Sequence, residues 1–166
     1  MVHAVSGSVQ ERCTDASWAR PVAILVTGRR LSFIVRAERE AVPAARSEIA
    51  AQLQMWGLPR GGEIVATAVL AVSELVTNVV KHAAHSAPAA DVTLALEDGE
   101  LVLAVHDRHP ALPKPSAAVD ADQIGGRGLW LIEALAAEAG GSIGFPADAD
   151  GGGKAVEVRL PLVGTP

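Results

Sequence analysis

The chain is poor in the residues that mark secreted or nucleic-acid-binding proteins. Its 166 residues include one cysteine, Cys13, which cannot form an internal disulfide, and this favours a reducing cytoplasmic location. Three tryptophans, two phenylalanines and no tyrosine argue against a stacking platform for single-stranded nucleic acid. A net charge of −5 does not favour a broad phosphate-binding surface for duplex nucleic acid either.

Long hydrophobic runs are also missing. No stretch approaches the roughly 20 uninterrupted apolar residues of a membrane span. Residues 1–10 lack the charged start and the apolar run of a signal peptide. The length fits one domain with its own core. We therefore expect a soluble binding module or enzyme with no direct nucleic-acid or membrane partner.

The hydrophobic pattern predicts one two-layer domain. Apolar residues at helical spacing indicate helices, and alternation around Asp98-Gly99 indicates a hairpin in which Val92 faces Val105. The predicted fold class is α/β (an α+β two-layer sandwich), with helices on one face of a mixed, mostly antiparallel sheet. The expected strands are 21–26, 31–35, 91–97, 100–107, 141–145 and 154–160, and the expected helices are 42–56, 62–82 and 127–140.

Three polar residues recur every fourth position in the second predicted helix. Glu74, Asn78 and His82 lie roughly 6 Å apart along the axis and share one side. A carboxylate, an amide and an imidazole there can act as a proton acceptor, a metal-coordinating oxygen and an anion contact. Ser73 and Thr77 lie beside them, so a merely solvated polar face remains the alternative.

Two further segments contain candidate ligand-binding groups. Asp107 ends a predicted strand, where the strand would fix a carboxylate that the loop leaves exposed, although a turn-initiating aspartate fits as well. Residues 125–129 (GGRGL) open the third helix, and glycines at a helix start let backbone N–H groups approach an anion. Residues 108–124 contain three prolines and form a long loop of the kind that is usually functional or mobile.

Other chemistries are less well supported. The pairs His82/His85 and His106/His109 could ligate zinc only if they converged. Ser73 lies within a helix and lacks the strained turn of a nucleophile elbow. Residues 151–154 resemble a phosphate-binding loop only superficially, because a strand and not a helix follows.

Taken together, these segments resemble the motifs of the GHKL (Bergerat-fold) ATPase superfamily, which includes gyrases and histidine kinases. Residues 74–82 (ELVTNVVKH) resemble its N box, Asp107 its first glycine box and residues 126–129 its second, with residues 108–124 in the place of the ATP lid. Within that superfamily, residues 31–162 are most similar to small bacterial anti-sigma factors that are serine/threonine protein kinases. Residues 1–30 lie outside the resemblance, as a leader with a possible extra edge strand.

The resemblance implies ATP and Mg²⁺ as cofactors, a sigma factor and an anti-anti-sigma factor as protein partners, and phosphorylation of the latter on serine or threonine. By the same resemblance, Glu74 is the general base, Asn78 a Mg²⁺ ligand and Asp107 the acceptor for the adenine amino group. The remaining implied nucleotide-binding residues are Lys81, His82, Gly126, Arg127, Gly128, Leu129 and Lys154, and Arg46 is a candidate for the partner interface.

One departure from the family pattern keeps a second hypothesis open. Residues 107–111 (DRHPA) contain no glycine, whereas the first glycine box usually has two. Glycine permits close backbone approach and proline stiffens the chain, so the alternative is a binding-only regulator with degenerate ATP chemistry. A metal-dependent enzyme using the histidine pairs is a third hypothesis. An unprotected edge strand at residues 21–26 further predicts a homodimer through the N-terminal half.

Overall fold

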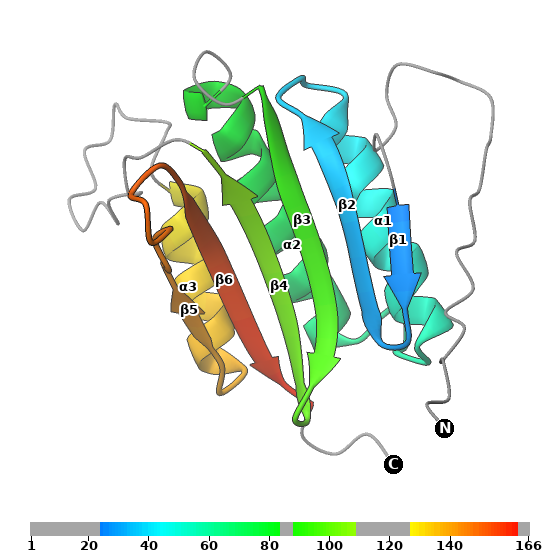
Figure 1. Cartoon of the computed structure of the whole chain (residues 1–166). Coiled ribbons are helices and arrows are strands. Elements are labelled where there is room, and N and C mark those ends of the chain that lie inside the picture. Colours follow the sequence, from blue (N-terminus) through cyan, green and yellow to red (C-terminus); the bar gives the residue numbers. More distant parts are fainter. Residues whose placement is uncertain (1–23, 84–87, 109–126, 163–166) are drawn as a thin grey trace, which may run out of the picture.

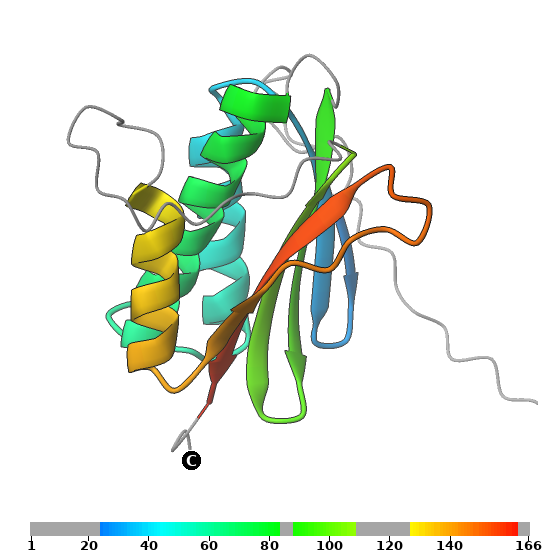
Figure 2. The same ribbon diagram turned by 90° about the vertical axis from the view of Figure 1, so that its left-hand side faces the viewer.

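The computed structural model describes residues 24–83, 88–108 and 127–162, without the side chains of His82, Ala83 and Arg127. In this part of the chain, six strands form one open sheet in the order β1-β2-β3-β4-β6-β5, and three α-helices cover one of its faces (Figures 1 and 2). The elements are β1 (Ile24–Thr27), β2 (Arg30–Arg36), α1 (Ala41–Met55), α2 (Glu63–Asn78), the π-helical turn η1 (Val79–Ala83), β3 (Ala89–Glu97), β4 (Glu100–Asp107), α3 (Arg127–Glu138), β5 (Ser142–Gly144) and β6 (Lys154–Pro161).

The predicted two-layer α+β fold is confirmed. All strand pairings among the described residues are antiparallel, so no parallel pair makes the sheet mixed there. Each strand presents alternate residues to the helices, as the period of two along a strand requires. The other face of the sheet is left without helices in the described structure (Figure 2).

The hairpin of β3 and β4 has the predicted turn and register. Asp98 and Gly99 both have positive φ, at 50° and 81°, which is the backbone that a two-residue type I′ turn needs. Val92 pairs with Val105, as predicted, and the register continues to the strand ends. The two strands expected at 21–26 and 31–35 correspond to β1 and β2, which pair with each other, and β1 forms an edge of the sheet; residues 21–23 lie outside the described residues.

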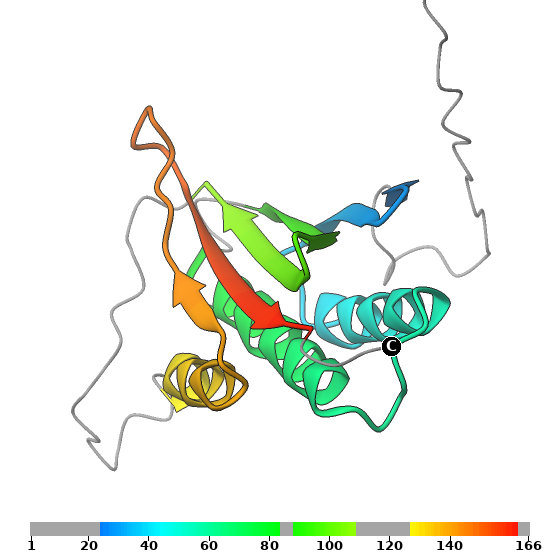
Figure 3. The ribbon, with the colours of Figure 1, turned by 90° about the horizontal axis from the view of Figure 1, so that it is seen from below.

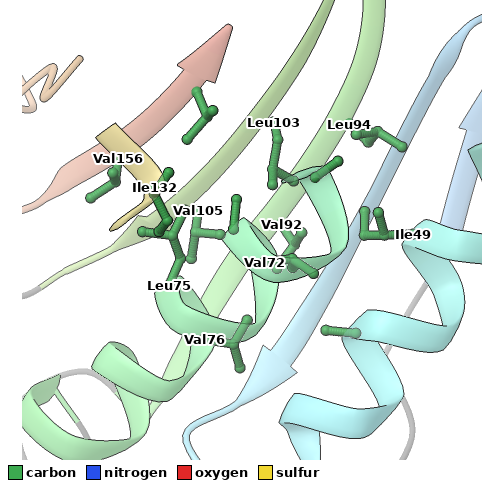
Figure 4. Close-up of a cluster of buried hydrophobic side chains, with 14 of the residues drawn as sticks. Ile49, Val72, Leu75, Val76, Val92, Leu94, Leu103, Val105, Ile132 and Val156 are labelled. Carbon is green, nitrogen blue, oxygen red and sulfur yellow. The ribbon is translucent and has the colours of Figure 1, made fainter. Parts of the chain in front are cut away.

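Helix α2 lies between α1 and α3 under the sheet, as Figure 3 shows from below. This position explains why its apolar residues extend beyond an ordinary stripe: the helix contacts neighbours on both sides as well as β4 and β6. Residues from all three helices and from four strands meet in the core, among them Ile49, Val72, Leu75, Val76, Val92, Leu94, Leu103, Val105, Ile132 and Val156 (Figure 4).

The burial of α2 also accounts for its hydropathy. The segment Glu63–Lys81 has a mean hydropathy of 1.7 and is long and apolar enough, by length and composition, to cross a membrane. This finding qualifies the expectation that no stretch approaches a membrane span. In the structure the helix packs into the core of the domain, and a helix that is apolar on most sides is expected in such a position.

The end of α2 differs from the prediction. A continuous α-helix to residue 82 was expected, but the α-helix ends at Asn78 and the chain continues as the π-helical turn η1. Single π turns at the end of α-helices are frequent at functional sites. The four-residue spacing therefore aligns Glu74 with Asn78 but does not extend in α-helical register to His82.

Candidate functional site

Four elements bring the predicted site residues to one end of the molecule. The end of α2, the end of β4, the start of α3 and the start of β6 all lie at the upper end of Figure 1, and Figure 2 agrees. Glu74 and Asn78 come from α2, Asp107 from β4, Gly128 from α3 and Lys154 from β6. Residues separated by up to 80 positions thus meet where the helical layer and the sheet end together.

Glu74 and Asn78 differ from the polar residues beside them. The Ser73 hydroxyl donates to the Val69 carbonyl at 2.6 Å, and the Thr77 hydroxyl donates to the Ser73 carbonyl at 2.7 Å. Both hydroxyls are therefore satisfied by the helix itself, and Ser73 is not placed as a nucleophile. Glu74 and Asn78 are half-buried and lie one turn apart at the end of the helix, which leaves a carboxylate and an amide at the site.

Gly128 packs directly against the Glu74 carboxylate. A Cβ on residue 128 would lie 2.9 Å from Glu74 Cδ and closer still to Oε2, which is nearer than real Cβ atoms approach their neighbours. The first turn of α3 therefore touches the predicted general base, and only glycine allows this approach without moving the carboxylate. The structure brings together the two segments that the sequence had singled out as separate motifs.

Asp107 and Lys154 form a buried ion pair at the same end of the sheet. Lys154 Nζ donates to Asp107 Oδ1 at 2.8 Å, and their side chains are 8% and 10% exposed, respectively. The two residues are direct partners in the β4–β6 register although they lie 47 positions apart in the sequence. The Lys154 ammonium group therefore contacts the carboxylate that was expected to accept a hydrogen bond from the adenine amino group.

The expectation that Asp107 is exposed was wrong. Asp107 has the same strand parity as Leu103 and Val105, so its side chain points toward the helices and not into solvent. At 7% exposure it is one of the few buried polar residues in the described structure. Burial of a carboxylate requires a partner, which Lys154 supplies.

The loop between β5 and β6 is held against the end of β4 by contacts that sequence reasoning missed. His106 Nε2 and Asp148 Oδ1 lie 2.8 Å apart, and Arg108 donates to Asp148 at 2.9 Å and to Asp150 at 3.2 Å. A Cβ on Gly153 would lie 2.7 Å from the Asp107 carbonyl oxygen, so this glycine lets the loop approach the backbone of β4. The sequence signal for this contact is weak: two aspartates at positions 148 and 150, and two basic residues at positions 106 and 108.

Charges in this loop shift the pKa values of its exposed groups. The backbone N–H of Gly152 and the Arg108 guanidinium lower the pKa of Asp150, the backbone hydrogen bond having the larger effect. The carboxylates of Asp150 and Asp148 in turn raise the pKa of Arg108. On β6, hydrogen bonds to Glu157 and Glu100 raise the pKa of Arg159.

The remaining predicted site residues are placed unevenly. Lys81 is exposed on η1. Leu129 is 6% exposed and belongs to the hydrophobic core, so its side chain packs α3 against the rest of the domain. Gly126 and the loop 109–124 lie outside the described residues, as do the side chains of His82 and Arg127. Arg46 is exposed on α1.

The donor set fits magnesium better than zinc. Among the described residues, no group of three or more His, Cys, Asp or Glu side chains could hold a metal ion alone. Magnesium usually takes one or two protein oxygen ligands and completes its coordination with phosphate oxygens and water, and the Asn78 amide oxygen fits that mode. His106 is instead bonded to Asp148, and its proposed zinc partner His109 lies outside the described residues.

The sequence matches a known domain family. The sequence pattern of the histidine kinase-like ATPase domain matches residues 35–159. No curated protein matches the chain.

Among solved structures, the chain is similar to the histidine kinase domain of the Erythrobacter litoralis EL346 blue-light activated histidine kinase, with 18% identity and a TM-score of 0.47 over 77% of this chain and 62% of that one. It is also similar to the Acinetobacter baumannii histidine kinase AdeS, with 11% identity and a TM-score of 0.47 over 79% of this chain and 68% of that one. The match over residues 35–159 covers well over half of the sequence, and the chain therefore belongs to the histidine kinase-like ATPase domain family.

Proposed function

We propose that this ATPase-family domain is an anti-sigma factor that binds Mg-ATP and phosphorylates an anti-anti-sigma partner on serine or threonine. The observation that carries the kinase part is the contact between Glu74 and Gly128, which sets a carboxylate at the start of α3 beside the Asn78 amide. The resemblance of residues 31–162 to small bacterial anti-sigma kinases supports the choice of partners. The sigma-factor partner in turn places the protein in the cytoplasm.

The proposed roles follow from the chemistry of each group. When bound, Mg-ATP supplies the phosphoryl group that is transferred. Asn78 would hold the magnesium ion through its amide oxygen, and Asp107 would accept a hydrogen bond from the amino group of the base. The N–H groups at the start of α3 would bind phosphate oxygens, because the helix dipole favours negative charge there.

In the proposed reaction, Glu74 accepts the proton of the attacking hydroxyl group. The hydroxyl oxygen bonds to the γ-phosphorus, the bond from that phosphorus to the β–γ bridging oxygen breaks, and ADP leaves. Removal of a general base typically lowers the rate about 10²- to 10⁴-fold.

The test of the kinase is a matched pair of substitutions on α2. Glu74→Gln removes the base without changing its shape, and Glu63→Gln makes the same change at an exposed residue of the first turn. We expect Glu74→Gln to bind Mg-ATP with wild-type affinity by calorimetry and to lose transfer of labelled phosphate to anti-anti-sigma proteins, whereas Glu63→Gln keeps both. Unchanged transfer in Glu74→Gln rejects the base assignment.

A binding-only regulator is the second candidate function, and a specific observation favours it. The segment after Asp107 has no glycine, and its first residue, Arg108, is already engaged by Asp148 and Asp150. Magnesium-dependent ATP binding that is lost in both Asn78→Ala and Asp107→Ala argues against this candidate. Absence of binding in a folded wild-type protein favours it.

The proposed assembly is a homodimer formed through the N-terminal half. Strand β1 is an edge of the sheet, and Leu25 on it is 47% exposed. An edge strand with an exposed large hydrophobic residue is open to pairing with a second copy. Light scattering at micromolar concentration tests this, and a monomeric mass contradicts it.

A further inference from the structure

Helix α3 exposes two large hydrophobic side chains that follow one another in the sequence. Trp130 is 59% exposed and Leu131 is 39% exposed. No other helix or strand in the described part of the chain has two exposed large hydrophobic residues. Single exposed hydrophobic residues are ordinary, whereas adjacent ones mark a contact with another molecule.

These side chains lie on the side of α3 that faces away from the domain. The residues that pack α3 into the core are Leu129, Ile132 and Ala136. On the opposite side, the exposed residues Ala134 and Ala137 follow Trp130 at steps of four and three. Helix α3 is the last helix of the helical layer, as Figure 3 shows, so no neighbouring helix covers this side in the described structure. We call Trp130, Leu131, Ala134 and Ala137 the α3 face.

Two acidic residues border the α3 face. Glu133 and Glu138 are exposed, and residues 128–140 contain no lysine or arginine. Neither glutamate forms an ion pair with another described residue. Glu138 is the last residue of α3, where the negative end of the helix dipole disfavours a carboxylate, and no basic residue in the last turn offsets it. These charges therefore do not stabilise the helix itself, and they can pair with a basic partner.

We propose that the α3 face docks a helix of a partner protein, an amphipathic helix with lysine or arginine beside its apolar stripe. The backbone groups of α3 bond within the helix, so a partner is recognised through side chains and cannot add as a strand. The small side chains of Ala134 and Ala137 let a second helix approach closely, with Trp130 as the large anchor. Basic residues of the partner would pair with Glu133 and Glu138. This inference goes beyond the proposed function and does not rest on it, because the α3 face has no role in the proposed nucleotide site.

Charge distinguishes this occupant from two others. A second copy docked about a two-fold axis would bring the same acidic residues against one another. The surface of an anionic membrane would repel them as well. A basic helix is therefore the occupant that the charges favour.

The probe is a pair of designed peptides of about 18 residues, long enough to form a helix in isolation. Both carry leucine at steps of three and four residues. One peptide has lysine on both sides of this stripe, and the other has glutamate at the same positions. Calorimetry on the full chain measures both, and we expect the glutamate peptide to bind at least about tenfold more weakly than the lysine peptide, because like charges oppose one another across an interface.

Variants of single residues locate the binding. We expect Trp130→Ala to weaken binding of the lysine peptide about tenfold or more, as is typical of a tryptophan anchor. Met55→Ala changes a residue of α1 that is 63% exposed and is expected to keep the wild-type affinity. Should Trp130→Ala fail to fold, Ala134→Lys places a cation at the centre of the α3 face and is expected to weaken the lysine peptide to the same extent.

A matched pair of double variants separates pairing at α3 from the general attraction of a basic peptide to an acidic protein. Glu133→Gln/Glu138→Gln removes the two charges beside the α3 face. Glu38→Gln/Glu63→Gln removes two exposed charges elsewhere, so both variants have the same net charge. We expect the first to bind the lysine peptide about threefold or more weakly than the second, in line with two exposed ion pairs.

Several outcomes would overturn the inference. Absence of binding of the lysine peptide to the folded wild type does so, as does equal binding of the two peptides. An equal loss in Trp130→Ala and Met55→Ala, or in the two double variants, places the peptide elsewhere on the protein. Self-association of the wild type that Trp130→Ala abolishes assigns the α3 face to a second copy, and binding to anionic lipid vesicles that the same variant abolishes assigns it to a membrane.

Discussion

Gly128 at the start of α3 lies against the carboxylate of Glu74 on α2, so that a Cβ on residue 128 would stand 2.9 Å from Glu74 Cδ. The contact joins two helices through the one side chain that the proposed reaction needs as a base. It also gives the glycine a physical role, because any other residue would move the carboxylate.

Gly128→Ala is expected to impair phosphotransfer while leaving the stability of the fold nearly unchanged. The clash falls on the end of a flexible side chain, which can move away, and alanine is the better helix former by about 1 kcal/mol. We expect a free energy of unfolding within about 1 kcal/mol of the wild type and a loss of phosphotransfer of about 10²-fold or more. Denaturant titration and the phosphotransfer assay measure the two effects.

The matched control is Gly144→Ala, because nothing lies within 4 Å of a Cβ built at Gly144. This variant is expected to keep both stability and activity. Wild-type phosphotransfer in Gly128→Ala would show that the position of Glu74 does not matter for the reaction.

Gly153→Ala is expected to have the opposite effect, with a clear cost in stability. A Cβ there would lie 2.5 Å from Asp148 Oδ2 and would also meet the backbone at the end of β4, 2.7 Å from the Asp107 carbonyl oxygen and 3.2 Å from Cα of the following residue, Arg108. Backbone cannot rotate away as a side chain does, and overpacking of this kind typically costs about 1–3 kcal/mol. Denaturant titration should show the loss in Gly153→Ala and little change in Gly152→Ala, whose Cβ would have the flexible side chains of Asp150, at 3.2 Å, and Arg108, at 3.5 Å, as its nearest neighbours. Equal stability of the two variants contradicts close packing of the β5–β6 loop against the end of β4.

Breaking the ion pair of Lys154 and Asp107 on one side is expected to be costly. Lys154→Met leaves a buried carboxylate without its cation, which typically destabilises a protein by about 3–5 kcal/mol. The double variant Asp107→Asn/Lys154→Met removes both charges and is expected to recover most of that loss. Denaturant titration of the two variants decides this, and a double variant no more stable than the single one refutes the pairing.

Asp150 predicts a pH dependence of stability. Its pKa in the folded protein is below the ordinary value of 3.8, mainly because the Gly152 N–H and the Arg108 guanidinium favour the charged form. The carboxylate therefore stabilises the fold above pH 3.8, and this contribution is lost as the pH falls through the lower folded value.

We expect Asp150→Asn to lower Tm slightly at pH 7, since the pair with Arg108 is exposed, and the difference to disappear in acid. Glu133→Gln, on the exposed side of α3, is the control and should leave Tm unchanged at both pH values. A difference in Tm between Asp150→Asn and the wild type that does not shrink as the pH falls below 3.8 contradicts the assignment.

Much of the fold follows from local pattern. The turn at Asp98-Gly99 needs two positive φ values, which its residues favour, and the turn then sets the register that pairs Val92 with Val105. The central helix was predicted from its apolar spacing, but its change to a π turn after Asn78 was not, because hydrophobic periodicity does not report the hydrogen-bond pattern of the last turn.

The candidate site was predictable in part. Glu74 and Asn78 were found because their four-residue spacing aligns them within one helix, a property of the local sequence. Gly128 was singled out for its place at a helix start, but its contact with Glu74 depends on how α3 packs on α2. The contacts of Arg108 and His106 with Asp148 were missed, since each joins residues about forty positions apart.

The sequence by itself determined the elements, their order, the register of the β3–β4 hairpin and the family motifs, because helix and strand periods, turn residues and short motifs are all local. Only the tertiary structure decided that Asp107 is buried, that Lys154 is its partner and that Gly128 limits the position of Glu74. The reason is that antiparallel pairing of β4 with β6 and the packing of α3 on α2 are long-range events, fixed by burial of the shared core and not by neighbours in the chain.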